Sequence, residues 1–153
     1  MESELKVSVA LVREEDLERL GKLYKQLTGR IPAYAKLLRG YKRAMENPNY
    51  ILLGAYLDDG TLVGTTSLSR CFDLTDDCLD YYSMENFVVD EAYRGRGVGT
   101  AIIRTVEGLC RATNVRYISF TSSASRIEAH RFYENLGYDP NKAKAFKKVF
   151  KEG

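Results

Sequence analysis

Three glycines at alternate positions join an apolar run to a helical pattern in the second half of the chain. Gly95, Gly97 and Gly99 follow the apolar pair Val88-Val89 after a short polar turn. Beyond them, residues that fit one helical face recur at Val98, Ala101, Ile102, Thr105, Val106 and Leu109. Glycine lets a ligand approach the backbone closely, and a helix start presents unpaired N–H groups and the positive end of a dipole. The stretch therefore predicts an anion site at a strand-to-helix junction.

The spacing of these glycines argues against the two common nucleotide loops. A P-loop requires the pattern GxxxxGK[ST], and no lysine follows the glycines. A Rossmann fingerprint requires a further glycine at a spacing where this chain has Thr100 or Ile102. A tight turn that needs glycine only for a positive φ angle is the structural alternative. Arg94 and Arg96, which flank the first glycine, favour the anion site.

The length and the apolar runs limit the class of protein. The 153 residues suffice for one domain with a substantial core, and we expect a single domain over residues 1–153. No apolar run approaches the roughly 20 residues that span a bilayer. The start, MESELKVSVALV, lacks the basic segment and cleavage site of a signal peptide. We therefore expect a cytoplasmic protein with no membrane partner.

Charge and cysteine content argue against two further kinds of partner. A net charge of +2 gives no reason to expect nucleic acid. Cys71, Cys78 and Cys110 are odd in number and show no CxxC spacing, so neither a disulfide framework nor a metal site is indicated. The locally basic tail from Lys142 to Lys151 is expected to be the exposed face of a terminal strand.

Apolar periodicity and turn residues predict the order β-α-α-β-β-β-α-β-α-β. Strands are expected at residues 6–12, 50–57, 62–69, 79–89, 117–121 and 145–150. Helices are expected at about 14–28, 32–46, 98–109 and 126–136. This order predicts a fold of the α/β class (mixed α+β), with helices on the faces of a mixed sheet.

Two motifs resemble the GNAT superfamily of acetyl-CoA-dependent N-acetyltransferases. The run RGRGVG (residues 94–99) matches the family pattern [Q/R]-x-x-G-x-[G/A], and EAHRFYENLGY (residues 128–138) is similar to A-x-x-F-Y-E-x-x-G-[FY]. The REEDL helix start, the DDGTLVG hairpin and the element order also resemble the family, so the resemblance covers nearly the whole chain. It implies a central mixed, mostly antiparallel sheet with flanking helices, in which the fourth and fifth strands form a splayed parallel pair.

The resemblance implies how acetyl-CoA is bound. The backbones of Phe87, Val88 and Val89 would pair with the pantetheine arm as a neighbouring strand does, because a splayed strand edge offers N–H and C=O groups. The pyrophosphate would be bound by a run of backbone amides, those of Arg94, Gly95, Arg96, Gly97, Val98, Gly99 and Thr100. The Arg96 side chain would add phosphate charge.

Two residues are candidates for proton transfer. At the position of Tyr133, the family has a tyrosine that acts as general acid for the leaving thiolate. At the position of Glu85, related enzymes have a carboxylate that points at the acceptor. By strand alternation Tyr81, Ser83, Glu85 and Phe87 share one face, so Glu85 reaches the cleft as a base or as a structural or substrate-binding acid.

The second motif departs from the family pattern at one position. Arg126 stands where many members have asparagine, and we expect an arginine there to contact CoA phosphate instead. The only histidine, His130, lies off the face that carries Tyr133, and we expect it at a solvated helix position.

The resemblance implies that the second helix and the loop before the long strand shape the acceptor pocket. These segments supply acid and aromatic groups, namely Tyr34, Tyr41, Asp73, Asp76, Asp77, Asp80, Tyr81 and Tyr82. Such groups suit a small cationic amine, although an acidic loop is usually only solvated. The alternatives are a protein N-terminus or lysine as acceptor, or a CoA-binding module without turnover. Dimers are common in the family, so a homodimer is compatible with the resemblance.

Overall fold

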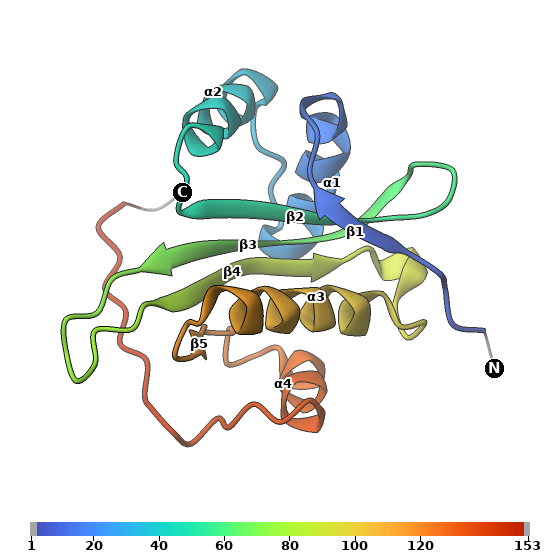
Figure 1. Ribbon diagram of the computed structural model, residues 1–153. Coiled ribbons are helices and arrows are strands. Elements are labelled where there is room, and N and C mark those ends of the chain that lie inside the picture. Colours follow the sequence, from blue (N-terminus) through green and yellow to red (C-terminus); the bar gives the residue numbers. More distant parts are fainter. Residues whose placement is uncertain (1–2, 152–153) are drawn as a thin grey trace. The chain divides into compact units, whose positions relative to one another are not determined.

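Five strands form one sheet in the first part of the chain, in the spatial order β1-β2-β3-β4-β5 (Figure 1). The computed structural model describes residues 3–151, which divide into a compact unit that ends at Ser119 and a second that begins at Phe120. The strands are β1 (Ser8–Leu11), β2 (Tyr50–Tyr56), β3 (Leu62–Cys71), β4 (Tyr81–Val89) and β5 (Ile118–Ser119). The expectation of a single domain over the whole chain stays a prediction.

The pairing of the strands confirms the mixed sheet. β1, β2, β3 and β4 pair in antiparallel fashion, whereas β4 and β5 are parallel. β2 and β3 form the predicted hairpin, in which Asp59 Oδ1 accepts a hydrogen bond from the Thr61 amide at 2.9 Å. This bond is of the kind that aspartate makes in tight turns, and it sets the register of the hairpin.

Four α-helices correspond to the four predicted helical patterns. They are α1 (Leu17–Thr28), α2 (Tyr34–Met45), α3 (Val98–Thr113) and α4 (Ile127–Asn135). Short 3-10 turns precede two of them, η1 (Glu14–Asp16) before α1 and η2 (Glu91–Tyr93) before the loop to α3. α1 ends as predicted at Gly29, which has a φ angle of 81° and donates its amide to the Lys25 carbonyl at 2.8 Å. Among the described residues, none of the helices has the length and apolar character to cross a membrane.

The core of the first unit lies on both faces of the sheet. A cluster of buried residues joins the sheet to α1, and it consists of Val12, Leu17, Leu20, Leu23, Leu52, Tyr56, Leu62 and Val88. On the other face α3 packs closely on β3. A Cβ atom on Gly64 would lie only 3.0 Å from Ile102 and 3.2 Å from Val98. Burial of each large aliphatic side chain contributes about 1.5–3 kcal/mol, so the two helices hold the sheet between them.

A β-bulge interrupts β4 near its middle. Thr65 pairs with Val88 and Ser67 pairs with Glu85, so Asn86 and Phe87 lie opposite the single residue Thr66. Asn86 has a φ angle of 52°, in the left-handed region that asparagine tolerates better than most residues. The extra residue shifts the side-chain alternation of the strand by one position.

The bulge corrects the prediction that Glu85 and Phe87 share a face. Before the bulge, Tyr82 faces α3, because its hydroxyl accepts a 3.3 Å hydrogen bond from Thr113 Oγ1. After the bulge, Val88 packs in the cluster with Leu17 and Leu20 of α1. Two even-numbered residues thus lie on opposite faces, so Phe87, which precedes Val88, lies on the face opposite to Glu85.

The second unit contains α4 and a group of aromatic rings. The Phe120 ring lies with its centroid 4.6 Å from that of Tyr133 and 5.3 Å from that of Tyr138. The predicted strand at residues 145–150 is wrong, because the described residues after α4 form neither helix nor strand. Phe146 and Phe150 are 91% and 87% exposed, so their apolar pattern does not correspond to a buried face.

Candidate active site

The glycine loop begins α3 with backbone conformations that suit glycine. Gly95 and Gly97 have φ angles of 73° and 89°, in a region that costs other L-residues about 1–2 kcal/mol. Gly97 is the N-cap of α3, and glycine has no side chain that could accept hydrogen bonds from the first-turn amides. This geometry is compatible with the anion site expected at the N-terminus of this 16-residue helix, which stays a prediction.

The N-terminal segment lies against this loop. The Leu5 amide donates to the Arg96 carbonyl at 2.8 Å, and Arg96 Nε donates to the Ser3 carbonyl at 3.0 Å. A Cβ atom on Gly97 would lie 2.7 Å from Glu4 Cγ and Oε1. Gly97 is therefore required for its φ angle, and a side chain at this position would also displace the exposed Glu4 side chain.

Asp90 and Arg94 hold the segment between β4 and the loop. Asp90 is 5% exposed, and its carboxylate accepts from the Ala92 amide at 3.0 Å, from Gln26 Nε2 at 3.3 Å and from Arg19 Nη2. Burial acts to raise the pKa of Asp90, but these hydrogen bonds and the charge of Arg19 outweigh it, so the pKa is lowered. Arg94 Nε donates to the Val89 carbonyl at 2.9 Å. The loop is thus fixed at its start.

The edge of β4 next to β5 is paired only near its beginning. Within residues 3–151 the paired residues are Tyr82 with Ile118 and Ser83 with Ser119. The ladder between β4 and β5 ends there, before the bulge and before residues 87–89. This geometry is that of the predicted splayed parallel pair, which is the arrangement that a strand-like ligand can extend.

Glu85 lies at the last residue before the bulge. Its side chain is exposed, and Oε1 accepts a 3.3 Å hydrogen bond from Ser83 Oγ. Its backbone carbonyl accepts from Thr66 Oγ1 at 3.0 Å and from Ser67 Oγ at 3.3 Å. Two hydroxyl groups of β3 therefore fix the backbone of Glu85 while its carboxylate stays accessible.

Tyr133 lies in the second unit and is buried. Its ring contacts Phe120, Phe132 and Tyr138. Burial raises the pKa of Tyr133 to about 12, against a smaller lowering effect of the positive charge of Arg126. The phenol therefore stays protonated at neutral pH, which is the state that a proton donor requires.

Two other predicted residues of this unit have defined environments. Arg126 is half-buried and precedes α4 as its N-cap. His130 is partly exposed on α4, and its Nε2 lies 2.9 Å from the Ser123 carbonyl. The Arg126 amide also bonds the Ser123 carbonyl, at 3.0 Å, so His130 helps to hold the turn before α4.

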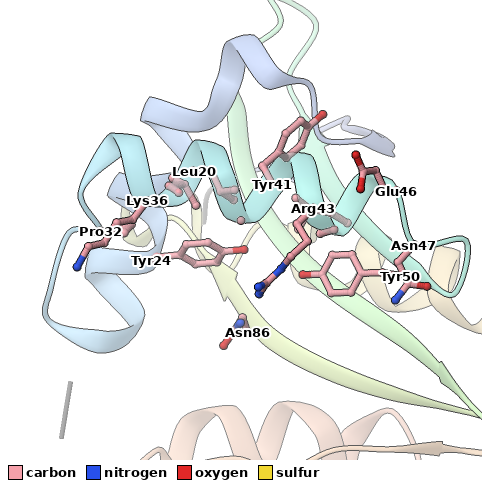
Figure 2. A pocket seen from close by; sticks show the side chains of 14 residues that line it. Leu20, Tyr24, Pro32, Lys36, Tyr41, Arg43, Glu46, Asn47, Tyr50 and Asn86 are labelled. Atoms are coloured by element: carbon pink, nitrogen blue, oxygen red, sulfur yellow. The ribbon is translucent and has the colours of Figure 1, made fainter. Parts of the chain in front are cut away.

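A cavity of about 860 Å3 opens between α1, α2 and β2 in the first unit (Figure 2). Asn86 of the β4 bulge also lines it. Its polar side chains are Tyr24, Lys36, Tyr41, Arg43, Glu46, Asn47, Tyr50 and Asn86. The hydroxyls of Tyr24 and Tyr50 point toward each other, with the Arg43 guanidinium between them (Figure 2).

Of the residues that were expected to shape an acceptor site, Tyr41 lines this cavity. Tyr34 is 54% exposed and does not line it. The acidic loop is bound by arginines instead. Arg116 binds Asp77, and its Nη1 also lies 3.7 Å from Asp76 Oδ2, while Arg70 Nε binds Asp80 Oδ2 at 2.7 Å. These carboxylates are thus largely compensated within the protein.

The comparison with known proteins agrees with this geometry. The model of the acetyltransferase (GNAT) family matches residues 13–138. The chain belongs to this family. A curated relative, the uncharacterized protein YxbD of Bacillus subtilis (strain 168), is 26% identical over 85 residues, which are 56% of this chain and 48% of YxbD. The match thus spans about half the length of that relative.

Solved structures with the same fold cover almost the whole GNAT chain. A transcriptional regulator from Bacillus halodurans C-125 is similar with a TM-score of 0.87 and 22% identity, over 95% of this chain and all of that one. AAC(6')-Iy, solved in complex with the bisubstrate analog CoA-S-monomethyl-acetylneamine, is similar with a TM-score of 0.77 and 19% identity, over 94% and 98% of the two chains. At these identities the likeness shows the fold.

The predicted site residues of this GNAT chain fall into two groups. Glu85 and the cofactor-binding residues up to Thr100 lie together at the end of β4 and the start of α3, whereas Arg126 and Tyr133 belong to the second unit. Within residues 3–151 no group of three or more His, Cys, Asp and Glu side chains is arranged to hold a metal ion.

Sequence reasoning missed several residues of the site. Tyr24 fits an apolar helix face and Tyr50 starts a strand, so neither has a functional signal of its own. Arg43 lies two residues after Tyr41, where helical spacing predicts solvent. Asn86 had a signal, because asparagine is unfavourable inside a strand and tolerates positive φ angles at a bulge.

Proposed function

We propose that the protein is an N-acetyltransferase that moves the acetyl group of acetyl-CoA to the primary amine of a small molecule. One observation carries this proposal: the pairing of β4 with β5 ends at Ser83 and Ser119, and the same strand leads directly into the glycine loop that begins α3. An extended amide-bearing arm and a pyrophosphate need these two features in this order.

The residues present fit CoA chemistry. Phe87, Val88 and Val89 supply strand backbone beyond the paired part of the β4 edge, with the Val89 carbonyl already bound by Arg94. The loop amides from Arg94 to Thr100 supply donors for the pyrophosphate in this proposal, and Gly97 adds no side chain at the N-cap. Arg96 and Arg126 add positive charge for phosphate groups in this proposal.

Two side chains move the protons in the proposed reaction. The acceptor nitrogen attacks the thioester carbonyl in a ternary complex, a C–N bond forms and the C–S bond breaks. Glu85 takes the proton that the amine loses, directly or through water, and Tyr133 donates its proton to the leaving thiolate. The pKa of Tyr133, raised by burial to about 12, keeps that proton available.

A screen of acceptors tests the proposal. Acetyl-CoA binding is measured by calorimetry, and CoA release is measured with a panel of small amines, N-terminal peptides and lysine peptides. We expect binding of acetyl-CoA and release of CoA with at least one small amine. Absence of acetyl-CoA binding would overturn the proposal. Binding without release for any acceptor would favour a CoA-binding module without turnover, and release with peptides alone would favour a protein acetyltransferase.

Location and assembly remain predictions of the same kind. We propose a cytoplasmic enzyme, and a homodimer that light scattering of the purified chain would detect.

A further inference from the structure

The cavity between α1, α2 and β2 offers positive charge at one defined place. Arg43 of α2 extends its guanidinium into the cavity between the hydroxyls of Tyr24 and Tyr50 (Figure 2). Lys36 of the same helix also lines the cavity, and among the described residues the one lining carboxylate is that of Glu46. Figure 2 shows Glu46 beside Tyr41, turned away from the guanidinium.

The position of Arg43 is set by the packing of α2. Tyr41, two residues earlier, donates its hydroxyl to the Val12 carbonyl at 2.9 Å, which ties the helix to the end of β1. Leu37 and Leu38 pack against the core cluster. The helix is therefore held from its buried side, and the Arg43 side chain is left to the cavity.

The groups around the guanidinium are hydrogen-bond donors. Burial and the neighbouring Tyr50 raise the pKa of Tyr24, so its hydroxyl stays protonated at neutral pH. Within residues 3–151 the side chain of Arg43 makes no hydrogen bond or ion pair, and neither do the hydroxyls of Tyr24 and Tyr50. Tyrosine hydroxyls can accept as well as donate, but no bond joins them to the guanidinium, so the donors of all three groups are available to a ligand.

We propose that the acetyl acceptor carries an anionic oxygen group, a carboxylate or a phosphate, which binds to Arg43 and to the hydroxyls of Tyr24 and Tyr50. This inference rests on the proposed function, because it assigns the cavity to the acceptor. The planar guanidinium matches two oxygens of such a group, and charge-assisted bonds of this kind are the stronger ones. An acceptor that placed an ammonium group here would be repelled by the positive charge of Arg43.

The cavity also reaches the strand that carries the proposed chemistry. Asn86 lines it from the β4 bulge, and Asn86 follows Glu85 directly. An acceptor whose anion binds at Arg43 can therefore extend its amine toward β4. The acidic loop, which suggested a cationic acceptor, is instead bound to Arg116 and Arg70.

Matched acceptors that differ only in the anion test this inference. The probes are glucosamine 6-phosphate against glucosamine, L-phenylalanine against L-phenylalaninamide, and spermidine as a cation. Binding of each to the protein saturated with CoA is measured by calorimetry, and CoA release from acetyl-CoA is measured separately. The variants are Arg43→Gln, Tyr24→Phe and, as the matched control, Arg39→Gln, which removes an exposed charge one turn earlier that does not line the cavity.

We expect at least one anionic probe to bind more tightly than the matched probe that lacks the anion. The glucosamine pair tests a phosphate, and the phenylalanine pair tests a carboxylate. Arg43→Gln should weaken that binding by roughly 10- to 100-fold, Tyr24→Phe by less, and Arg39→Gln by under twofold. Equal affinity within both pairs, tighter binding of spermidine, or unchanged affinity in a folded Arg43→Gln variant would overturn the inference. Should Arg43→Gln fail to fold, the matched pairs and Tyr24→Phe still decide. Failure of the wild-type protein to bind acetyl-CoA would instead refute the proposed function, because acetyl-CoA binding is measured without any ligand of this cavity.

Discussion

The guanidinium of Arg19 in α1 binds the carboxylate of Asp90, the first residue after β4. Arg19 also donates its Nε to the Leu62 carbonyl at 2.9 Å, so one side chain joins α1 to both β3 and the end of β4. The glycine loop starts four residues further along. Its position on the sheet therefore depends on a polar contact that is almost completely buried on the Asp90 side.

Replacement of Asp90 by asparagine should destabilise the fold in a pH-dependent way. The free energy of unfolding should fall by about 1–3 kcal/mol at pH 7, because the donors from Arg19 and Ala92 lose a charged acceptor. The pKa of folded Asp90 lies below the ordinary value of 3.8, so its ionised form stabilises the fold above that value. This stability is lost as the pH falls through the folded pKa.

Urea unfolding of wild type and Asp90→Asn at pH 7, 5 and 3 measures this effect. The difference between the two proteins should shrink toward pH 3. Glu91→Gln is the control, since it neutralises the adjacent exposed acid and should change stability by less than about 0.5 kcal/mol. A difference that is the same at every pH would contradict the assignment.

Replacement of Gly97 by alanine should weaken acetyl-CoA binding at least about tenfold, because a left-handed conformation costs alanine about 1–2 kcal/mol. The new Cβ would also lie 2.7 Å from Glu4 Cγ. Gly108→Ala in α3 is the matched control, since nothing lies within 4 Å of its Cβ position and alanine favours helix. Titration calorimetry with acetyl-CoA measures both.

A double variant separates the two causes at Gly97. Glu4→Ala in the Gly97→Ala background removes the contact but leaves the φ angle of 89°. We expect affinity to recover in part. Affinity equal to wild type in Gly97→Ala alone would exclude this loop as the pyrophosphate site.

Replacement of Tyr133 by phenylalanine should lower kcat by about 10²-fold and leave the KM for acetyl-CoA unchanged, because a general acid acts in the chemical step. With a pKa of about 12, Tyr133 stays protonated through neutral pH, so its own ionisation should not reduce the rate below about pH 10. Tyr138→Phe is the control, as it makes the same change in the same aromatic group. Equal rates for Tyr133→Phe and wild type would exclude the role.

The raised pKa of Tyr133 also has a consequence for stability. Its contribution is complete below the unfolded value of 10.0 and is lost as the pH rises toward about 12. Wild type should therefore lose more stability than Tyr133→Phe between pH 9 and pH 11.5, which thermal unfolding measures.

Replacement of Glu85 by glutamine should lower kcat by about 10²-fold near pH 7. The deficit should shrink as the pH approaches the pKa of a primary amine, near 10, because the acceptor then loses its proton without help. Glu18→Gln, an exposed acid of α1, is the control. A deficit that is constant from pH 7 to pH 10 would assign Glu85 to substrate binding or structure instead.

Most of the first unit was predictable because local pattern and tertiary packing agree there. Leu17, Leu20 and Leu23 repeat at helical spacing and are all buried against the sheet. The glycine loop was predictable for the same reason, since its signal is local. The terminal strand was not, because alternation at Phe146 and Phe150 says nothing about whether a partner strand is present.

The cavity that we propose for the acceptor could not be predicted from the sequence, for a different reason. It combines Tyr24 of α1, Arg43 of α2 and Tyr50 of β2, and no local pattern states that three separate elements converge. The acidic loop gave a strong local signal for a cationic acceptor, and this signal was misleading. The arginines that neutralise the loop come from β3 and from the turn before β5, which the local sequence does not reveal.

The extra residue in the β4 bulge at Asn86 changes the face of the sheet that the following side chains occupy. Glu85, before the bulge, lies on the same face of the strand as Val88, which follows the bulge and enters the core. If β4 ran through Asn86 with regular pleating and no bulge, Val88 would turn to the opposite face and leave the α1 cluster. Loss of the bulge would thus destabilise the fold. The packing of Val88 against α1 therefore maintains the irregular backbone next to Glu85.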